Sequence, residues 1–483
     1  MSAHDTAFRV ETRGIDVVTD GERHGSPKGL FWVWFSGQLT ISAIIIGQLF
    51  TTLGLSLGEA VIVSAFTALS FVVVGLASLP GPHAGTATLT ISRASFGIKG
   101  NILPAFFSWL NLVGWESVTI VITVNAMLSL AKVLGFPASG TAPTLFALVF
   151  ALILTFSIPI LGHATVVIMQ RFLAYGIGAL AIVMVFLVVP HVHWMHTPIV
   201  SHLAAQGVVP TMVLAASIGL MSTSLSWTNY AADYTRYLSK TTSGKSIVVY
   251  TALGGGLASF LFLSVGALLG TFIRPAAYGA NPVAATMHIL PNWYAIPFLL
   301  VVIVGQIANN YLNAYSSSMS FLALGVKLKR YYSVMIDAGL STLISLYALF
   351  LAPGFLSFFE NFLSLSILVI GPWTAIYLVN HWMVKGHYDG TGFFNDQSSP
   401  YWFKNGVNWS AVGSLIIGGF AAFWTVNSAL WVSPLSSHYL LGMDLSAFVG
   451  PIVAGFVYAL WTRPFAQNIS VAPAMANRVK VEE

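Results

Sequence analysis

Long apolar stretches, separated by short polar segments, run along almost the whole chain. A helix needs roughly 20 apolar residues to cross the hydrocarbon core of a bilayer. Stretches of that length begin near Gly29, Glu59, Asn101, Ala142, Thr165, Pro210, Ile247, Trp293, Tyr331, Leu356, Val407 and Asp444. Because backbone groups in lipid must be satisfied within the segment, this pattern predicts an all-α protein with about twelve membrane-spanning helices rather than a barrel of alternating strands.

The two ends of the chain are polar, which divides it into three parts. We predict a tail over residues 1–28, a transmembrane domain over 29–464 and a second tail over 465–483. The first apolar stretch runs about 25 residues, which is too long for the core of a signal peptide. We therefore expect it to be the first span.

Composition and charge support a lipid environment. The chain is 56% hydrophobic and only 7% charged, whereas an average soluble domain carries about 25% charged residues. Cytoplasmic loops are enriched in Lys and Arg, and with a cytoplasmic N-terminus all of these residues except Lys132 and Arg274 fall on the inside. The sequence therefore predicts a multi-pass protein of the cell membrane with both termini in the cytoplasm. Its net charge of +5 then reflects basic loops, not nucleic-acid binding.

Four acidic residues fall within the predicted spans, where ionisable side chains are costly and mark candidate functional sites. They are Glu116 in the third helix, Asp233 at the end of the sixth, Asp337 in the ninth and Glu360 in the tenth. Arg236 lies three residues after Asp233, so we expect an ion pair at the cytoplasmic end of that helix and consider both residues for a gate. For the other three acids, a functional role and a structural hydrogen bond remain equally open.

Two of the predicted helices contain polar and small residues in their middle. The first carries Gly37-Gln38-Leu39-Thr40-Ile41-Ser42, and the sixth carries a run of Ser and Thr between Ser217 and Tyr230. Many transporters build their sites from helices broken near the middle of the bilayer, where freed carbonyls hold a cation and freed N–H groups hold substrate. The two helices occupy corresponding positions in two halves of five helices, which suggests an inverted repeat. Ordinary helix packing through Ser and Gly is the alternative.

Aromatic and amide side chains accompany these candidate breaks. Trp115 follows a glycine in the middle of the third helix, and Trp227 lies beside the expected break in the sixth. Asn309 and Asn313 are four residues apart in the eighth helix, so both point to one face. Indole faces stack on flat heteroaromatic rings, and carboxamides both donate and accept, which matches the edges of nucleobases.

Several longer strings resemble one family of transporters. The segment from Thr90 to Trp115 contains SRASFGIKGNILPAFFSWLNLVGW, residues 227–237 read WTNYAADYTRY, residues 308–316 read ANNYLNAYS and residues 360–363 read ENFL. Together they resemble the nucleobase–cation symporter family, particularly its purine–cytosine permease branch. The resemblance implies a LeuT-like core, in which an inverted 5+5 repeat of ten helices is joined by two peripheral helices and works by alternating access.

The resemblance also implies roles for individual residues. It places a nucleobase between Trp115 and Trp227. The other residues that match family positions are Asn309 and Asn313 for ring recognition, Ser42 for substrate contact, and the carbonyls near Gly37 and Ile41 for the cation.

The chain departs from the family pattern at two places. Members that use sodium carry hydroxyl side chains just before the first amide of helix eight, where this chain has Ile307 and Ala308. An amide often lies four residues after the Trp of helix three, where this chain has Thr119, and Glu116 follows that Trp directly. We therefore expect Thr119 and Glu116 to alter recognition of the ring edge.

The missing hydroxyls favour the proton over sodium as the coupling ion. A proton needs only a titratable group, and Glu116, next to Trp115, is the preferred carrier, with Glu360 and Asp337 as the other candidates.

The sequence thus predicts a secondary transporter that imports cytosine or purines together with a proton. A related heterocycle, such as allantoin, a hydantoin or a vitamin pyrimidine, transported with sodium, is the alternative. The chain has no Cys, no HExxH motif and no Ser-His-Asp pattern among its spans, so neither an enzyme nor a bound cofactor or metal is expected.

Overall fold

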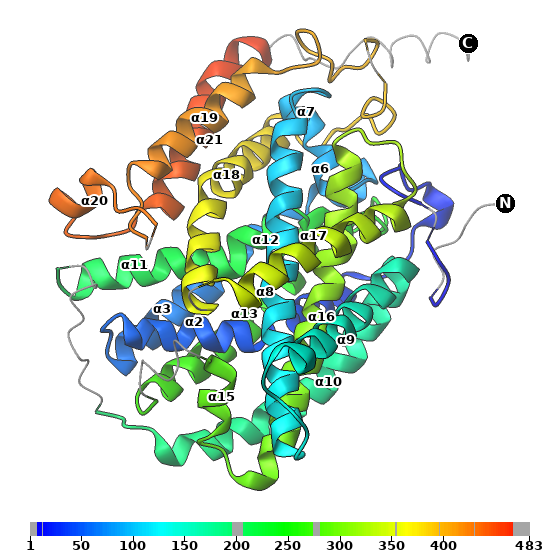
Figure 1. Ribbon diagram of the computed structural model, residues 1–483. Coiled ribbons are helices and arrows are strands. Elements are labelled where there is room, and N and C mark those ends of the chain that lie inside the picture. Colours follow the sequence, from blue (N-terminus) through cyan, green and yellow to red (C-terminus); the bar gives the residue numbers. More distant parts are fainter. Residues whose placement is uncertain are drawn as a thin grey trace, which may run out of the picture.

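The computed structural model describes residues 7–466 except 12, 196–205, 274–280, 353–354, 396 and 429. Helices make up most of this part of the chain, and the β-structure in it is limited to isolated bridges (Figure 1). Large apolar side chains lie on the outer surface: Phe146, Phe172 and Phe186 are 76%, 68% and 72% exposed. An outer surface of this kind suits lipid rather than water, as the composition predicted.

The long helices follow the predicted order, and short helices or turns interrupt some of them. The first five spans are α1 (Pro27–Gln38) with α2 (Ile41–Thr52), α3 (Leu57–Leu69) with α4 (Val72–Ala77) and α5 (Pro80–Ala84), α8 (Ile102–Val133), α9 (Thr141–Leu161) and α10 (His163–Val188). The next five are α11 (Val208–Leu220) with α12 (Ser226–Thr228), α13 (Gly244–Gly270), α16 (Asn292–Ala323), α17 (Arg330–Phe350) and α18 (Phe355–Met383). They are followed by α19 (Trp409–Phe423) and α21 (Ser446–Ala466).

Short helices occupy several connections: α6 (Thr88–Ile91), α7 (Arg93–Phe96), α15 (Pro282–Met287) and α20 (Pro434–His438). Among the described residues, nine helices are long and apolar enough to cross a membrane, or ten if the bent pair α1 and α2 is one span. The apolar parts of α19 and α21 are shorter than the others. The total of twelve spans therefore stays a prediction.

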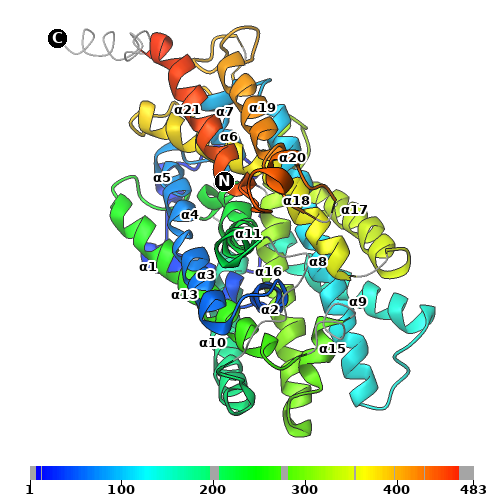
Figure 2. The ribbon, with the colours of Figure 1, turned by 90° about the vertical axis from the view of Figure 1, so that its left-hand side faces the viewer.

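The packing follows the predicted repeat. Helices in corresponding positions of the two sets of five contact each other: α2 with α11, α3 with α13, α8 with α16 and α9 with α17. Helices α19 and α21 pack on each other and on α18, and both views place them together at one edge of the molecule (Figures 1 and 2). This is the arrangement of a 5+5 core with two peripheral helices.

The first span is broken where the sequence predicted it. Helix α1 ends at Gln38, α2 begins at Ile41, and the two helix axes differ by 59°. The sixth span is distorted in a different way, because a π-helical turn over Met221–Leu225 separates α11 from α12. The hydroxyl of Thr223 donates to the carbonyl of Gly219 over 2.6 Å in this turn. A side-chain hydroxyl thus adds a hydrogen bond to the backbone at this distortion.

Two glycines allow the broken span to lie directly against α13. A Cβ atom at Gly47 of α2 would lie 1.9 Å from the carbonyl oxygen of Leu263, and one at Gly266 would lie 2.1 Å from that of Ile44. The two backbones therefore touch, which is how small residues let helices associate in lipid, where the hydrophobic effect contributes little.

The N-terminal tail is anchored to the bundle by a buried acid. Glu11, whose side chain is 2% exposed, pairs with Arg236 over 3.2 Å and with Arg330 over 3.7 Å. The hydroxyl of Tyr237 donates to the same carboxylate over 2.7 Å, and so does the backbone N–H of His163 over 3.0 Å. One tail residue thus connects the start of α10, the segment after α12 and the start of α17.

The expected ion pair between Asp233 and Arg236 was wrong. Asp233 instead accepts hydrogen bonds of 2.8 Å from both the backbone N–H and the hydroxyl of Thr88. The 3₁₀ turn Ala231–Tyr234 ends before Arg236, so the two side chains do not belong to one helical segment. The guanidinium of Arg236 is therefore available to Glu11.

Replacing Glu11 by Ala should strongly destabilise the protein. The change would leave two buried arginines without their carboxylate, and breaking a buried pair on one side costs about 3–5 kcal/mol. Thermal unfolding in detergent should show a clearly lower melting temperature. Asp20→Ala is the matched control, because the Asp20 carboxylate is 73% exposed and pairs with Lys240 at the surface, where ion pairs contribute little. Equal melting temperatures for the two variants would contradict this account of the tail.

Candidate functional site

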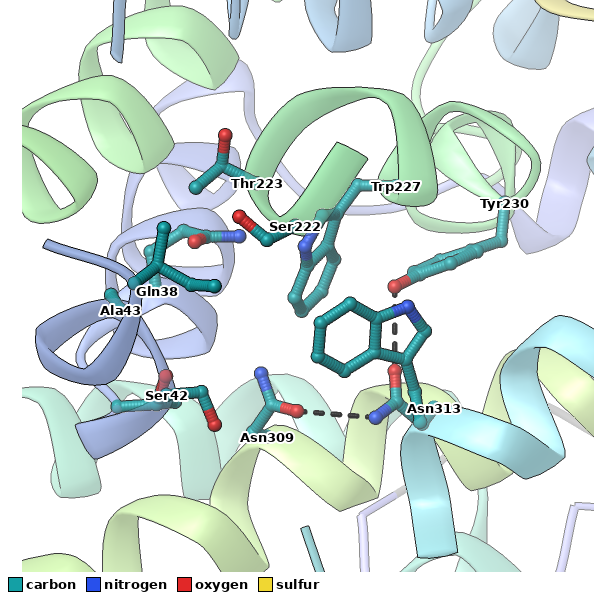
Figure 3. Close-up of a pocket in the computed structure, with 12 residues that line it drawn as sticks. Gln38, Ser42, Ala43, Ser222, Thr223, Trp227, Tyr230, Asn309 and Asn313 are labelled. Atoms are coloured by element: carbon teal, nitrogen blue, oxygen red, sulfur yellow. Dashed lines mark hydrogen bonds between the residues drawn. The ribbon is translucent and has the colours of Figure 1, made fainter. Parts of the chain in front are cut away.

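A small cavity lies between the breaks in the first and sixth spans (Figure 3). The space in it that is open to the centre of a water molecule is about 20 Å³. The lining residues are Gln38, Thr40, Ser42, Ala43, Ile46, Trp115, Ser222, Thr223, Trp227, Tyr230, Asn309 and Asn313. Five of the residues predicted to contact substrate are among them: Ser42, Trp115, Trp227, Asn309 and Asn313.

Neighbouring rings and a close backbone hold the two tryptophans in place. The ring of Trp227 contacts that of Trp34 edge to face, with centroids 5.6 Å apart. It also lies against Gly37, where a Cβ atom would come within 3.3 Å of the indole. The ring of Trp115 meets Phe362 edge to face at 5.5 Å. Both indoles line the cavity, so each presents part of its ring to a ligand there.

The amide side chains of α16 form a connected series. Asn309 donates to the carbonyl of Gly37 over 2.7 Å. Asn313 donates to the side-chain oxygens of Asn309 and Asn310, 3.1 Å away in each case, and accepts from the hydroxyl of Tyr230 over 3.3 Å. An amide has two N–H groups and two acceptor positions. Asn309 therefore keeps one donor and one acceptor position for a ligand, and Asn313 keeps one acceptor position.

Gln38, at the end of α1, is a lining residue that the sequence analysis did not select. It is 4% exposed, and its oxygen accepts from the hydroxyl of Ser259 over 3.2 Å. Its side-chain nitrogen has no partner among the described residues. The place of Gln38 next to Gly37 in the predicted break was the signal that could have identified it. Its amide supplies two further donors at the cavity.

Other lining residues were also missed as ligand contacts, although most of them lie within the predicted breaks. Thr40, Ala43 and Ile46 belong to the first span, and Ser222, Thr223 and Tyr230 to the sixth. Their side chains are individually ordinary, so only the three-dimensional approach of the two spans identifies them.

One of the two carbonyls predicted to hold a cation, that of Gly37, is engaged by a protein donor. The carbonyl of Gly37 accepts from Asn309, and the carbonyl of Ala308 accepts from Gln170 over 2.6 Å. Ile307 has no side-chain oxygen, and Ile41 is the first, buried residue of α2. The carbonyl of Gly37 therefore already accepts a hydrogen bond, and Ile307 and Ala308 add no hydroxyl for a metal ion.

Glu116 and Thr119 lie on α8 but do not line the cavity. The hydroxyl of Thr119 lies 2.9 Å from the carbonyl of Trp115, within its own helix. The Glu116 carboxyl points to α16 and α17, where it accepts from Ser317 over 2.7 Å. Asp337 lies beside it, whereas the side chain of Glu360 on α18 lies outside the described residues.

Comparison with known proteins agrees with this geometry. Residues 17–450 match the profile of a family described as permeases for cytosine/purines, uracil, thiamine and allantoin. YxlA of Bacillus subtilis, whose name gives it as a purine-cytosine permease, is 26% identical over 95% of this chain and 97% of its own length. The Saccharomyces cerevisiae purine-cytosine permease FCY22 is 25% identical over 89% of this chain and 82% of its own.

A solved structure shares the fold. Mhp1, a nucleobase-cation-symport-1 family transporter in a closed conformation with bromovinylhydantoin bound, superimposes with a TM-score of 0.74. The two chains are 16% identical, and the match covers 96% of this chain and 97% of Mhp1. The family match spans most of the sequence and the fold is that of a transporter. The chain therefore belongs to the family of permeases for cytosine/purines, uracil, thiamine and allantoin, and it is a multi-pass membrane transporter rather than an enzyme.

Proposed function

We propose that this protein imports cytosine or purines in symport with protons, by alternating access, across the cell membrane. The observation that carries the proposal is the convergence of Trp115, Trp227, Asn309 and Asn313 on one cavity at the helix breaks. The names of the relatives, purine-cytosine permeases, support the same substrate class. The basic loops support an orientation with both termini in the cytoplasm.

A nucleobase would enter between the two indoles. Stacking on an aromatic side chain contributes about 1–3 kcal/mol per base. Only about 20 Å³ of the cavity is open to the centre of a water molecule, so its side chains lie close together. The distorted backbone beside Trp227 is a place where they can move apart when a ring enters.

The polar groups suit the edge of a nucleobase. Asn309 offers a donor and an acceptor position side by side, which matches a ring edge with an adjacent acceptor and donor, as in cytosine and adenine. Asn313 and Tyr230 add acceptor positions, and Gln38 adds donors. Thr119 and Glu116, expected at the ring edge from the sequence, lie outside the cavity, and an effect of theirs on recognition would be indirect.

The proton is the coupling ion that the contacts support best. Sodium leaves its water shell only for several oxygen ligands held together. Here Asn309 occupies the carbonyl of Gly37, Gln170 occupies that of Ala308, and Ile307 supplies no oxygen. A proton needs a single titratable group, and Glu116 is the proposed carrier, with Asp337 and Glu360 as the other candidates.

Opening to the cytoplasm would require the network around Arg236 to separate. Arg236 connects Glu11 of the tail with the hydroxyl of Tyr315 on α16, 2.8 Å away. Asp233 fixes the neighbouring turn through Thr88. We therefore retain Arg236 and Asp233 as gating residues, in separate contacts rather than as a pair.

Trp227→Ala should abolish uptake while the protein still reaches the membrane. The loss of stacking, about 1–3 kcal/mol, corresponds to roughly 5–150-fold weaker binding. Uptake of radiolabelled base and binding to purified protein would measure it, and Trp115→Ala should behave in the same way. Trp293→Ala is the control, because that indole lies on α16 but is 64% exposed. Unchanged transport kinetics in Trp227→Ala would exclude the proposed site.

Asn313→Ala should weaken binding most for the best substrate. An unpaired buried group on the ring costs about 1–3 kcal/mol, and poor substrates have less of this interaction to lose. Thermal shifts with a panel of cytosine, purines, allantoin and hydantoins would measure the change, and would also identify the substrate. A uniform loss across the panel would indicate a folding defect instead.

Uptake into vesicles should follow a proton gradient and be abolished by a protonophore. The reason is that the sodium ligands are engaged, whereas buried carboxyls are present. Imposed gradients of pH and of sodium, applied separately, would distinguish the two ions. Uptake driven by sodium at constant pH and indifferent to a protonophore would exclude proton coupling and favour the alternative, a related heterocycle carried with sodium.

A further inference from the structure

A second polar cluster lies outside the substrate cavity, between α8, α16 and α17. Its acidic members are Glu116 of α8 and Asp337 of α17, which are both 0% exposed. Ser317 of α16 lies between them, and none of the three lines the cavity at the helix breaks. Two carboxyl groups buried this deeply in a membrane protein are costly, which makes the cluster a candidate for function.

Each carboxyl oxygen of the pair has a close partner. The Oγ atom of Ser317 lies 2.7 Å from Oε1 of Glu116 and 2.7 Å from Oδ2 of Asp337. The hydroxyl of Ser341 donates to Oε2 of Glu116 over 2.7 Å. The indole N–H of Trp109 donates to Oδ1 of Asp337 over 2.6 Å. All four oxygens are therefore at hydrogen-bonding distance from a neighbouring nitrogen or oxygen.

The hydrogens available determine the protonation of the pair. A serine hydroxyl carries one hydrogen, and an ionised carboxylate carries none. The Ser317 hydroxyl also lies 3.3 Å from the carbonyl of Ala314, a longer contact than those to the two acids. Ser317 can donate its hydrogen to Glu116 or to Asp337 but not to both, so at least one of its two 2.7 Å contacts needs a hydrogen from a carboxyl. One carboxyl is then a neutral acid that donates to Ser317, and the other accepts from Ser317.

No cation offsets the pair among the described residues. Apart from the pair, the charged side chains of α8, α16 and α17 are Lys132, in the last turn of α8, and Arg330, which pairs with Glu11. Helix α9, packed on all three, contains no charged residue. The side chain of Glu360 on α18 lies outside the described residues. Two adjacent carboxylates would repel each other, whereas a pair that holds one proton carries a single charge.

The cluster is connected to the substrate cavity through α8 and α16. Trp115, which lines the cavity, directly precedes Glu116. The amide of Asn310 donates to the backbone carbonyl of Glu116 over 3.1 Å, and its oxygen accepts from Asn313, 3.1 Å away. A substrate that takes over a hydrogen bond of Asn313, or turns Trp115, therefore alters the contacts of the helical turn that carries Glu116.

From these contacts we infer that Glu116 and Asp337 form one proton-binding site, in which a single proton is shared through Ser317. Loading converts one carboxylate of the pair to a carboxylic acid, and unloading returns it to a carboxylate. This inference rests on the proton coupling proposed above and deepens it, because the carrier is the pair rather than Glu116 alone. Ser317 is a positioning residue that connects the two carboxyl groups.

The first test separates coupling from transport. Glu116→Gln and Asp337→Asn, reconstituted in vesicles, should each lose proton-driven accumulation of the base while substrate counterflow, which needs no net proton movement, persists. Asp337→Glu should recover accumulation, because it restores a carboxyl. Ser333→Ala is the matched control, since Ser333 is a buried serine of α17 whose hydroxyl donates to the carbonyl of Arg330 over 2.6 Å.

The second test observes the proton itself. Infrared spectra of the purified protein should contain the C=O band of a protonated carboxylic acid that is lost in the double variant Glu116→Gln/Asp337→Asn and kept in Ser333→Ala. If Asp337→Asn loses counterflow as well, the transport assay cannot separate coupling from transport. The infrared band then tests the shared proton site directly.

Two results would overturn the shared site while leaving proton symport intact: full proton-driven accumulation in Asp337→Asn, or an unchanged acid band in the double variant. Wild-type uptake driven by sodium alone would instead overturn the proposed coupling.

Discussion

The hydrogen bond from the amide of Asn309 to the carbonyl of Gly37 is the contact on which the centre of the molecule depends. A helix broken inside a membrane frees backbone groups that neither lipid nor a continuous helix can satisfy. The break between α1 and α2 is tolerated because α16 supplies donors at that point, and Gln306 does the same for the hydroxyl of Ser42. The same bonds position Asn309 and Ser42 at the cavity.

Helix α8 connects the two polar regions of the core because consecutive residues point in different directions. Trp115 faces the cavity, and Glu116 faces α16 and α17. Helix α16 has the same property, with Asn313 at the cavity and Ser317, one turn later, between the two acids. Recognition of a ring and binding of a proton can therefore occupy separate places and still share two helices.

Much of the fold could be predicted from the sequence by itself, because lipid imposes strict conditions. A span must be apolar over about 20 residues, so the positions of the long helices follow from the hydrophobic pattern. Polar residues in mid-span are tolerated at few places, so the break at Gly37–Ser42 was also visible. Trp115 and Trp227 were selected because indole faces stack on flat heteroaromatic rings.

The tertiary structure decided which groups meet. Arg236 pairs with Glu11, 225 positions earlier in the chain, because the helical turn that carries Asp233 ends at Tyr234 and the N-terminal tail brings a carboxylate to the guanidinium. Glu116 of α8 and Asp337 of α17 both contact Ser317 of α16. No local sequence pattern predicts that two residues so far apart in the chain lie side by side. The sequence thus determined where the chain crosses the membrane and which residues could act, since burial in lipid acts on each segment separately. Only packing determined their partners, because a partner depends on the helices that approach from elsewhere.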